Sequence, residues 1–274
     1  MSQINDWDDA FANMAHIPGS DALPRKWAAD AAAYRQTVRV DEHFYGEHPR
    51  EAFDIVWPDA KPKGLAVFVH GGYWIRMDKS YWTDFAEGAR ANGWAVCMPQ
   101  YTLAPEARIG HMTLQIGRAI NTVAGLVAGP IHIAGHSAGG HLVSRMVCQD
   151  TPLKAQVMDR LKHTLSISGL HDLRPLIHTQ MNIEQRIDEE EATQESAVLL
   201  RPHHQANITA WVGGGERPEF LRQAKLLGMM WQGLDVQTDV VIDGKHDHFS
   251  VLDDLKDPNS AITSAFIGNR LFKR

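Results

Sequence analysis

The pentapeptide Gly-His-Ser-Ala-Gly at residues 135–139 follows an apolar run and precedes a helical pattern. A tight turn between a strand and a helix strains the central serine and needs small neighbours, which Gly135 and Gly139 provide. Such a turn holds the Ser137 hydroxyl at the edge of a sheet, and the following helix leaves the backbone N–H of Ala138 free. The pattern therefore predicts Ser137 as a nucleophile and Ala138 as part of an oxyanion hole.

A second pattern, His-Gly-Gly-Tyr-Trp at residues 70–74, follows the apolar run 65–69. Two glycines let the backbone come close to a bound carbonyl and direct an N–H group at it. We therefore expect Gly71 and Gly72 to complete the oxyanion hole. Each motif alone has a simpler explanation, a helix cap or an ordinary turn, but their placement after two apolar runs favours catalysis.

A nucleophilic serine needs a histidine that takes its proton and a carboxylate that orients the histidine. Only His246 and His248 follow the last predicted strand. We favour His248, because it opens the short apolar stretch 249–252 that would fix its backbone. His246 lies in a looser turn and remains the alternative.

The candidate acids at predicted strand ends are Glu216, Glu219, Asp243 and Asp247. Glu216 follows a strand through three glycines, a turn that can bring its side chain to the sheet edge, and it is our choice over Asp243. Asp247 adjoins the histidine in sequence, and neighbouring side chains in extended chain point apart.

Aromatic residues follow the glycine pair and the histidine. Tyr73, Trp74 and Tyr81 come after the first motif and Phe249 comes after His248. We expect these four side chains to line a substrate pocket, although Tyr81 would equally suit the core of a helix.

The strands and helices that position the catalytic candidates can be predicted from the sequence pattern. Apolar, β-branched runs alternate with amphipathic stretches, which is typical of α/β proteins. We predict a mostly parallel eight-stranded sheet flanked by helices. The predicted strands are Thr37–Tyr45, Ala52–Trp57, Leu65–His70, Trp94–Gln100, Ile131–His136, Thr164–Ser168, Ile208–Val212 and Val236–Ile242. The predicted helices are Leu23–Gln36, Tyr81–Asn92, Met112–Val127, Gly139–Gln149, Glu219–Gln232 and Asn259–Phe272.

We expect one domain over residues 1–274, with an insertion at about 172–205 between two strands. Long excursions from a compact sheet are often functional, so the insertion predicts a small lid. Its acidic run, residues 188–191, is interpreted as a solvated helix face rather than an ion site.

The chain has 274 residues, 44% hydrophobic and 22% charged, a composition typical of a globular protein. Its formal net charge of -6 argues against a nucleic-acid partner, whose phosphates call for a basic surface. The first residues lack a secretory pattern, and no apolar run approaches the ~18 residues of a membrane span. We expect a cytoplasmic protein that binds a small-molecule substrate, without a nucleic-acid or membrane partner. A homodimer is left open.

The two cysteines, Cys97 and Cys148, lie in an apolar run and a helical pattern, which favours free thiols over a disulfide. The pairs His203-His204 and His246-x-His248 have no matching partners at a zinc-binding spacing, so we expect no metal. The predicted chemistry requires no cofactor.

The motifs together resemble the α/β-hydrolase superfamily, and within it the kynurenine formamidase (arylformamidase) branch of esterase-like enzymes. The resemblance runs from about Asp41 to Leu255. Besides the serine and glycine motifs, it rests on Ser-Gly-Leu-His-Asp-Leu-Arg-Pro at 168–175, Gly-Glu-Arg-Pro-Glu-Phe at 215–220 and Asp-His-Phe at 247–249.

The resemblance implies Ser137 as nucleophile, Glu216 as acid and His248 as base, which agrees with the choices made from the residues. This branch would carry aspartate where the chain has Glu216, an arm one methylene longer. The segment Asp172–Leu200, including Thr179 and Asn182, resembles the lid of the branch.

The expected function is that of a serine hydrolase in tryptophan catabolism, which would cleave an aryl formamide such as N-formylkynurenine through an acyl-enzyme. Two alternatives remain. One is a general carboxylesterase for short-chain esters, and the other is a non-catalytic binding protein with a hydrolase fold.

Overall fold

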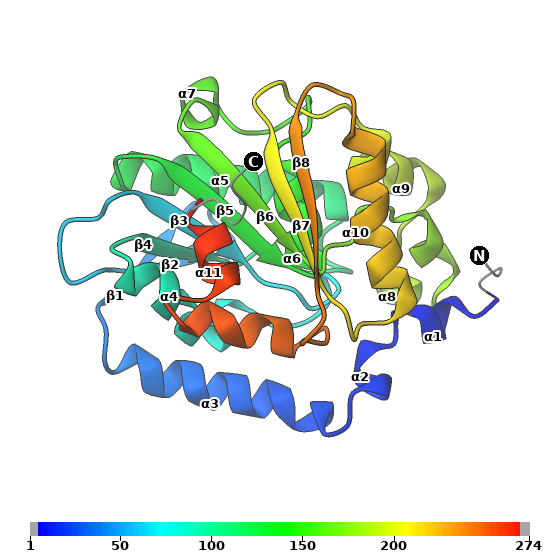
Figure 1. Ribbon diagram of the computed structural model, residues 1–274, viewed down its shortest axis with the longest axis horizontal. Coiled ribbons are helices and arrows are strands. Elements are labelled where there is room, and N and C mark those ends of the chain that lie inside the picture. The colour runs from blue at the N-terminus through cyan, green and yellow to red at the C-terminus, as the bar shows by residue number, and fades with distance from the viewer. Residues whose placement is uncertain (1–4, 269–274) are drawn as a thin grey trace.

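The computed structural model describes residues 5–268, whose centre is an eight-stranded sheet in the order β1-β2-β4-β3-β5-β6-β7-β8 (Figure 1). The strands are β1 (Val40–Phe44), β2 (Ala52–Val56), β3 (Leu65–Val69), β4 (Ala95–Pro99), β5 (Ile131–His136), β6 (Leu161–Ile167), β7 (Asn207–Gly213) and β8 (Gln237–Asp243). The β1–β2 and β2–β4 pairs are antiparallel and the other five pairs are parallel. The predicted mostly parallel sheet is confirmed.

The central strands are apolar because they are covered on both faces. Every residue of β2, β3, β4 and β5 is buried, whereas β1 and β8 at the sheet edges have exposed positions. All eight strands were predicted. The sixth strand begins at Leu161, before the predicted start at Thr164. The prediction missed its first residues because the exposed Lys162 interrupts the apolar run.

Helices cover both faces of the sheet (Figure 1). The α-helices are α1 (Trp7–Phe11), α2 (Asn13–His16), α3 (Leu23–Arg35), α4 (Glu87–Ala91), α5 (Ile109–Leu126), α6 (Ala138–Arg145), α7 (Ala155–Met158), α8 (Asn182–Gln185), α9 (Glu189–Glu195), α10 (Pro218–Trp231) and α11 (Ala261–Phe266). The 3₁₀ helices are η1 (Ser20–Ala22), η2 (Lys79–Tyr81), η3 (Thr83–Ala86), η4 (Arg174–His178), η5 (Ala197–Leu199) and η6 (Ser250–Lys256).

Three helix predictions need correction. The helix predicted over Gly139–Gln149 ends at Arg145, and Cys148 instead forms a β-bridge with Pro202. The single helix expected over Tyr81–Asn92 is divided into 3₁₀ turns and the short α4, since apolar spacing over three or four residues does not separate the two helix types. The last helix ends at Phe266, shortly before Gly268 with φ of 74°. Residues 269–274 lie outside the described residues.

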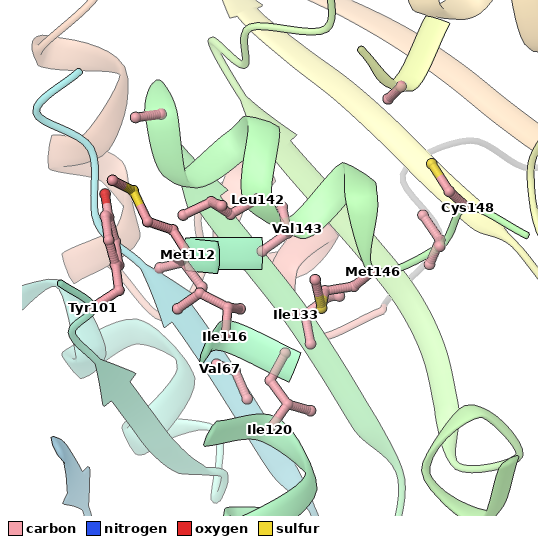
Figure 2. Close-up of a cluster of buried hydrophobic side chains, with 14 of the residues drawn as sticks. Val67, Tyr101, Met112, Ile116, Ile120, Ile133, Leu142, Val143, Met146 and Cys148 are labelled. Atoms are coloured by element: carbon pink, nitrogen blue, oxygen red, sulfur yellow. The ribbon is translucent and has the colours of Figure 1, made fainter. Parts of the chain in front are cut away.

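The sheet separates two hydrophobic clusters. One contains α5, α6 and α10, and Figure 2 shows its central part, where α5 and α6 pack on Val67 and Ile133 of the sheet. The other contains side chains of α3, α4, η6 and α11. Because both of its faces are buried, the sheet holds the carboxyl ends of its parallel strands together at one edge. The candidate catalytic residues lie at this edge.

The insertion at 172–205 folds into η4, α8, α9 and η5. Its acidic run is only partly a solvated face. Asp188 caps α9, and Glu191 is buried, where it pairs with Arg108 and accepts the N–H of Gly110 at the start of α5. The interpretation of the run is therefore corrected for Glu191, which anchors the insertion to α5.

Three negative findings concern residues 5–268. No helix in this range has the length and apolar character needed to cross a membrane. The range contains no group of three or more His, Cys, Asp or Glu side chains arranged to hold a metal ion. Cys97 and Cys148 are both buried free thiols.

Candidate active site

Ser137 occupies a strained turn between β5 and α6. Its backbone has φ of 55° and ψ of -115°, and its N–H donates to Ile167 O at 2.8 Å. The two flanking glycines are required by close packing: a Cβ on Gly135 would lie 2.2 Å from Gly139 O, and one on Gly139 would lie 2.0 Å from Val69 O. The turn is therefore the predicted nucleophile elbow in geometry.

The glycine loop after β3 lies against this serine. A Cβ on Gly71 would be 3.0 Å from the Cβ of Ser137, and Gly72 has φ of 108°. Within the described chain, the backbone N–H groups of Gly71, Gly72 and Ala138 donate no hydrogen bond. The structure thus leaves donors unused around Ser137, as an oxyanion hole requires.

His248 and Glu216 form a buried pair at the same edge. His248 Nδ1 lies 2.7 Å from Glu216 Oε2, and both side chains are almost fully buried. Because a carboxylate only accepts, Nδ1 carries a proton, and Nε2 is the ring nitrogen on which the neutral form of His248 has its lone pair. Within residues 5–268, no hydrogen bond joins Ser137 Oγ to His248 Nε2. In many enzymes such a bond tightens only when substrate binds.

Three groups hold this pair in place. Glu216 Oε1 accepts hydrogen bonds from the Ser168 hydroxyl and from Gly213 N–H, the latter at 2.7 Å. His136 Nε2 donates to His248 O at 2.8 Å, and burial lowers the pKa of His136 so that its ring stays neutral. The carboxylate and the histidine backbone are therefore fixed independently.

The alternative base and acids have other partners. His246 Nδ1 lies 3.0 Å from Ser250 O. Asp247 accepts from the N–H groups of Phe249 and Ser250, both at 2.9 Å, and so shapes the loop that carries His248. Asp243 accepts from Lys245 N–H, and Glu219 pairs with Arg222. Neither His246 nor any of these acids bonds to the His248–Glu216 pair within residues 5–268.

The four predicted pocket residues lie in different surroundings. Phe249 lines a cleft of about 160 Å³ between the η1–α3 region and the histidine loop, and it packs on Trp27 with ring centroids 5.6 Å apart. Trp74 is fully buried, edge-on to His141. Tyr73 and Tyr81 are partly buried. Their role in binding substrate stays a prediction.

The N-terminal segment 7–16 also reaches the site, which the sequence did not indicate. The Tyr73 hydroxyl donates to Phe11 O at 2.6 Å. Phe11 packs on Phe220, whose ring lies 4.5 Å from that of His248. Figure 1 shows α1 beside the start of α10, at the end of the sheet where the parallel strands finish.

Ser168 and His136 were not predicted as site residues. Ser168 stands at the end of β6 with φ of 51°, and it belongs to the segment 168–175 that carried the family resemblance. His136 ends the buried strand β5, and its ring donates to His248 O. Only the three-dimensional arrangement reveals that they contact Glu216 and His248.

Two curated proteins are similar to this chain over most of its length. A kynurenine formamidase from Danio rerio is 28% identical over 235 residues, covering 81% of this chain and 79% of the relative. One from Salmo salar is 27% identical over 237 residues, with the same coverage.

Solved structures match over nearly the whole chain. A "putative thioesterase" from Silicibacter sp. TM1040 has a TM-score of 0.90 at 44% identity, covering 96% of this chain and 99% of that one. Esterase B from Lactobacillus rhamnosis has a TM-score of 0.66 at 14% identity, covering 90% and 92%, which shows a shared fold. The family model described as alpha/beta hydrolase fold matches residues 66–228, more than half of the sequence. The chain belongs to the α/β-hydrolase fold family.

Proposed function

We propose that this protein is a serine hydrolase in which Ser137, His248 and Glu216 act as nucleophile, base and acid. The observation that carries the proposal is the buried His248–Glu216 hydrogen bond of 2.7 Å at the sheet edge that also holds the strained Ser137. A non-catalytic binding protein would have no need for this strain or for a buried histidine–carboxylate pair.

The chemistry follows from the proton positions. Ser137 Oγ attacks the substrate carbonyl while His248 Nε2 takes its proton, and Glu216 stabilises the imidazolium that forms. His248 then returns the proton to the leaving group, which departs and leaves an acyl-enzyme. Water repeats the sequence and releases the acid. The N–H groups of Gly71, Gly72 and Ala138 stabilise each oxyanion, and loss of one such donor costs about 3–4 kcal/mol.

For the substrate, we propose an aryl formamide such as N-formylkynurenine. The formamidase relatives support this class. So does the close approach of Gly71 to Ser137, since a formyl group places only hydrogen on the acyl side.

Short-chain ester or thioester hydrolysis is the second candidate. It is favoured by the similarity to the Silicibacter structure, at 44% identity over nearly the whole of both chains. Esters and thioesters use the same nucleophile and the same oxyanion hole. They differ from a formamide in the leaving group, which needs less help from His248 as a proton donor.

Parallel kinetics on N-formylkynurenine and p-nitrophenyl butyrate test the substrate class. We expect kcat/KM to be higher for the formamide, although the ester has the better leaving group. Efficient turnover of butyrate esters with no turnover of aryl formamides would replace the formamidase proposal by the esterase one.

A further inference from the structure

The glycine loop after β3, residues 70–76, has a strained backbone. Gly72, Tyr73 and Trp74 have φ of 108°, 51° and 60°, and two of these three residues carry a side chain. Residues with a side chain rarely adopt such angles, which persist only where surrounding contacts hold them. The loop also carries the Gly71 and Gly72 N–H groups of the proposed oxyanion hole, so the contacts that hold it fix the positions of these two donors.

One of these contacts comes from the insertion at 172–205. The side-chain amide of Gln185, the last residue of α8, donates from Nε2 to the carbonyl of Tyr73 at 3.2 Å. Within residues 5–268 it is the only donor to this carbonyl, whereas the carbonyls of Gly72 and Trp74 on either side accept backbone N–H groups. The Gln185 side chain therefore completes the hydrogen bonds to the strained part of the loop.

The amide of Gln185 is used for this single bond. The residue is 0% exposed, and its Oε1 makes no hydrogen bond within residues 5–268. An unpaired buried acceptor destabilises the folded state, and an apolar side chain of similar size, such as that of methionine, would not carry this penalty. The bond from Nε2 to Tyr73 O is thus the contact that explains a glutamine at this buried position.

The turn that carries Gln185 is itself held rigidly. Asn182, the first residue of α8, accepts the N–H of Ile187 at 2.7 Å, and its Nδ2 donates to Ile187 O at 3.0 Å and to Ile177 O at 3.2 Å. In the next helix, Glu191 accepts the N–H at the start of α5. These bonds fix the backbone on both sides of Gln185, so its side chain is preorganised against the glycine loop.

We propose that Gln185 is a positioning residue of the oxyanion hole. Through the Tyr73 carbonyl it keeps the glycine loop in the strained form that directs the Gly71 and Gly72 N–H groups at the substrate oxygen. This inference rests on the proposed hydrolase function, and it gives the insertion a part in stabilising the oxyanion. Because Gln185 acts through the loop, its effect on a substrate depends on how strongly that substrate uses the oxyanion hole.

Substrate pairs that differ only in C=O against C=S test this role, because a thiocarbonyl sulfur accepts hydrogen bonds poorly. We expect Gln185→Met, which keeps the volume and removes the donor, to lower kcat/KM for formanilide about tenfold. The value for thioformanilide should fall less than about threefold, since it gains little from the oxyanion hole. The loss for formanilide should lie in kcat rather than in KM, because the donors act mainly on the transition state.

Val198→Ala is the matched structural control. Val198 is a buried residue of η5 in the same insertion, and its N–H donates to His171 O. Loss of its methyl groups should lower the unfolding temperature and leave the oxygen-to-sulfur ratio of kcat/KM unchanged. If Gln185→Met does not fold, Gln185→Asn, whose shorter arm cannot reach Tyr73 O, enters the same comparison. Equal losses on the two substrates, or no loss on either, would overturn the inference.

Failure of the proposed function would look different. If the wild-type protein cleaves phenyl acetate but not formanilide, the formamidase proposal fails, and phenyl acetate with phenyl thionoacetate replaces the first pair with the same expected ratio. If it cleaves none of the four compounds, the hydrolase proposal fails.

The contact itself can then be tested without catalysis, by hydrogen exchange at the N–H groups of Ile75 and Arg76, which both donate to Gly72 O at 3.0 Å. Exchange should be about tenfold faster in Gln185→Met and unchanged in Val198→Ala. Unchanged exchange in Gln185→Met would contradict a role of Gln185 in holding the loop.

Discussion

The proposed nucleophile, Ser137, and the proposed acid–base pair, Glu216 and His248, lie at one edge of the sheet, but they are held there in different ways. Around Ser137 the backbone itself fixes the geometry, because Gly135 and Gly139 pack with no room for a Cβ. Glu216 and His248 are held instead through their side chains, by the Ser168 hydroxyl that donates to Glu216 and by the hydrogen bond between the pair itself. The residues that fix Ser137 lie within a short stretch of sequence. Those that fix Glu216 and His248 come from segments far apart in the chain.

The largest effect should come from a change in the hydrogen-bonded pair, Glu216 and His248. His248→Ala removes the group that moves both protons, and we expect kcat to fall about 10⁶-fold, equivalent to about 8 kcal/mol. Steady-state kinetics on the best substrate measures this loss. His246→Ala is the control and should change kcat little, because His246 is bonded to Ser250 O. The reverse ranking would make His246 the base.

Glu216→Gln should come next. The amide keeps the shape, but it stabilises neither the required tautomer of His248 nor the imidazolium, so we expect kcat to fall about 10⁴-fold. Asp243→Asn is the control at the neighbouring strand end and should remain close to wild type. If Asp243→Asn proved the more damaging change, the acid would be assigned to the wrong residue.

The turn at Ser137, whose geometry the backbone fixes, is tested through the free energy of unfolding. In Gly139→Ala the added Cβ meets Val69 O at 2.0 Å, so the turn must move, and we expect the free energy of unfolding to fall by about 3 kcal/mol. Gly125→Ala, in an exposed part of α5 with nothing within 4 Å, should instead gain about 1 kcal/mol. Urea denaturation measures both. A neutral Gly139→Ala would mean that backbone packing does not hold Ser137.

The smallest effect should come from Ser168→Ala. It removes one of the two donors on Glu216 Oε1 and leaves Gly213 N–H in place, so we expect kcat/KM to fall about tenfold. Its pH profile should shift as well, because the carboxylate that interacts with His248 is less stabilised. Ser80→Ala, at an exposed serine, is the control. A loss of activity with an unchanged pH profile would indicate only a structural role.

The same contrast explains how much of the fold could be predicted. Strands β3 and β5 are continuous apolar runs, and their ends carry the glycine motifs, so both the fold and Ser137 could be identified locally. The short helices α1, α2 and α7 were not predicted, because four or five residues carry too little periodicity.

In the site, the choice of Glu216 over Asp243 and of His248 over His246 depended on strand ends and chain order. The structure brings the chosen pair together. Ser168 and His136 could not be predicted in their roles, since each acts through a residue 48 or 112 positions away. Phe11 carried no motif, and only the folded chain brings it against Phe220, which packs on His248.

The central claim, that Ser137 is a nucleophile activated by His248, is tested most directly by covalent labelling with a serine-directed fluorophosphonate and mapping of the modified peptide. We expect one label per chain, on Ser137, absent in Ser137→Ala and formed at least 100-fold more slowly in His248→Ala, as expected for loss of a general base. Ser137→Ala should unfold at the wild-type temperature, because the hydroxyl is not a packing group. A label on another residue, or labelling that persists in Ser137→Ala, would contradict the account.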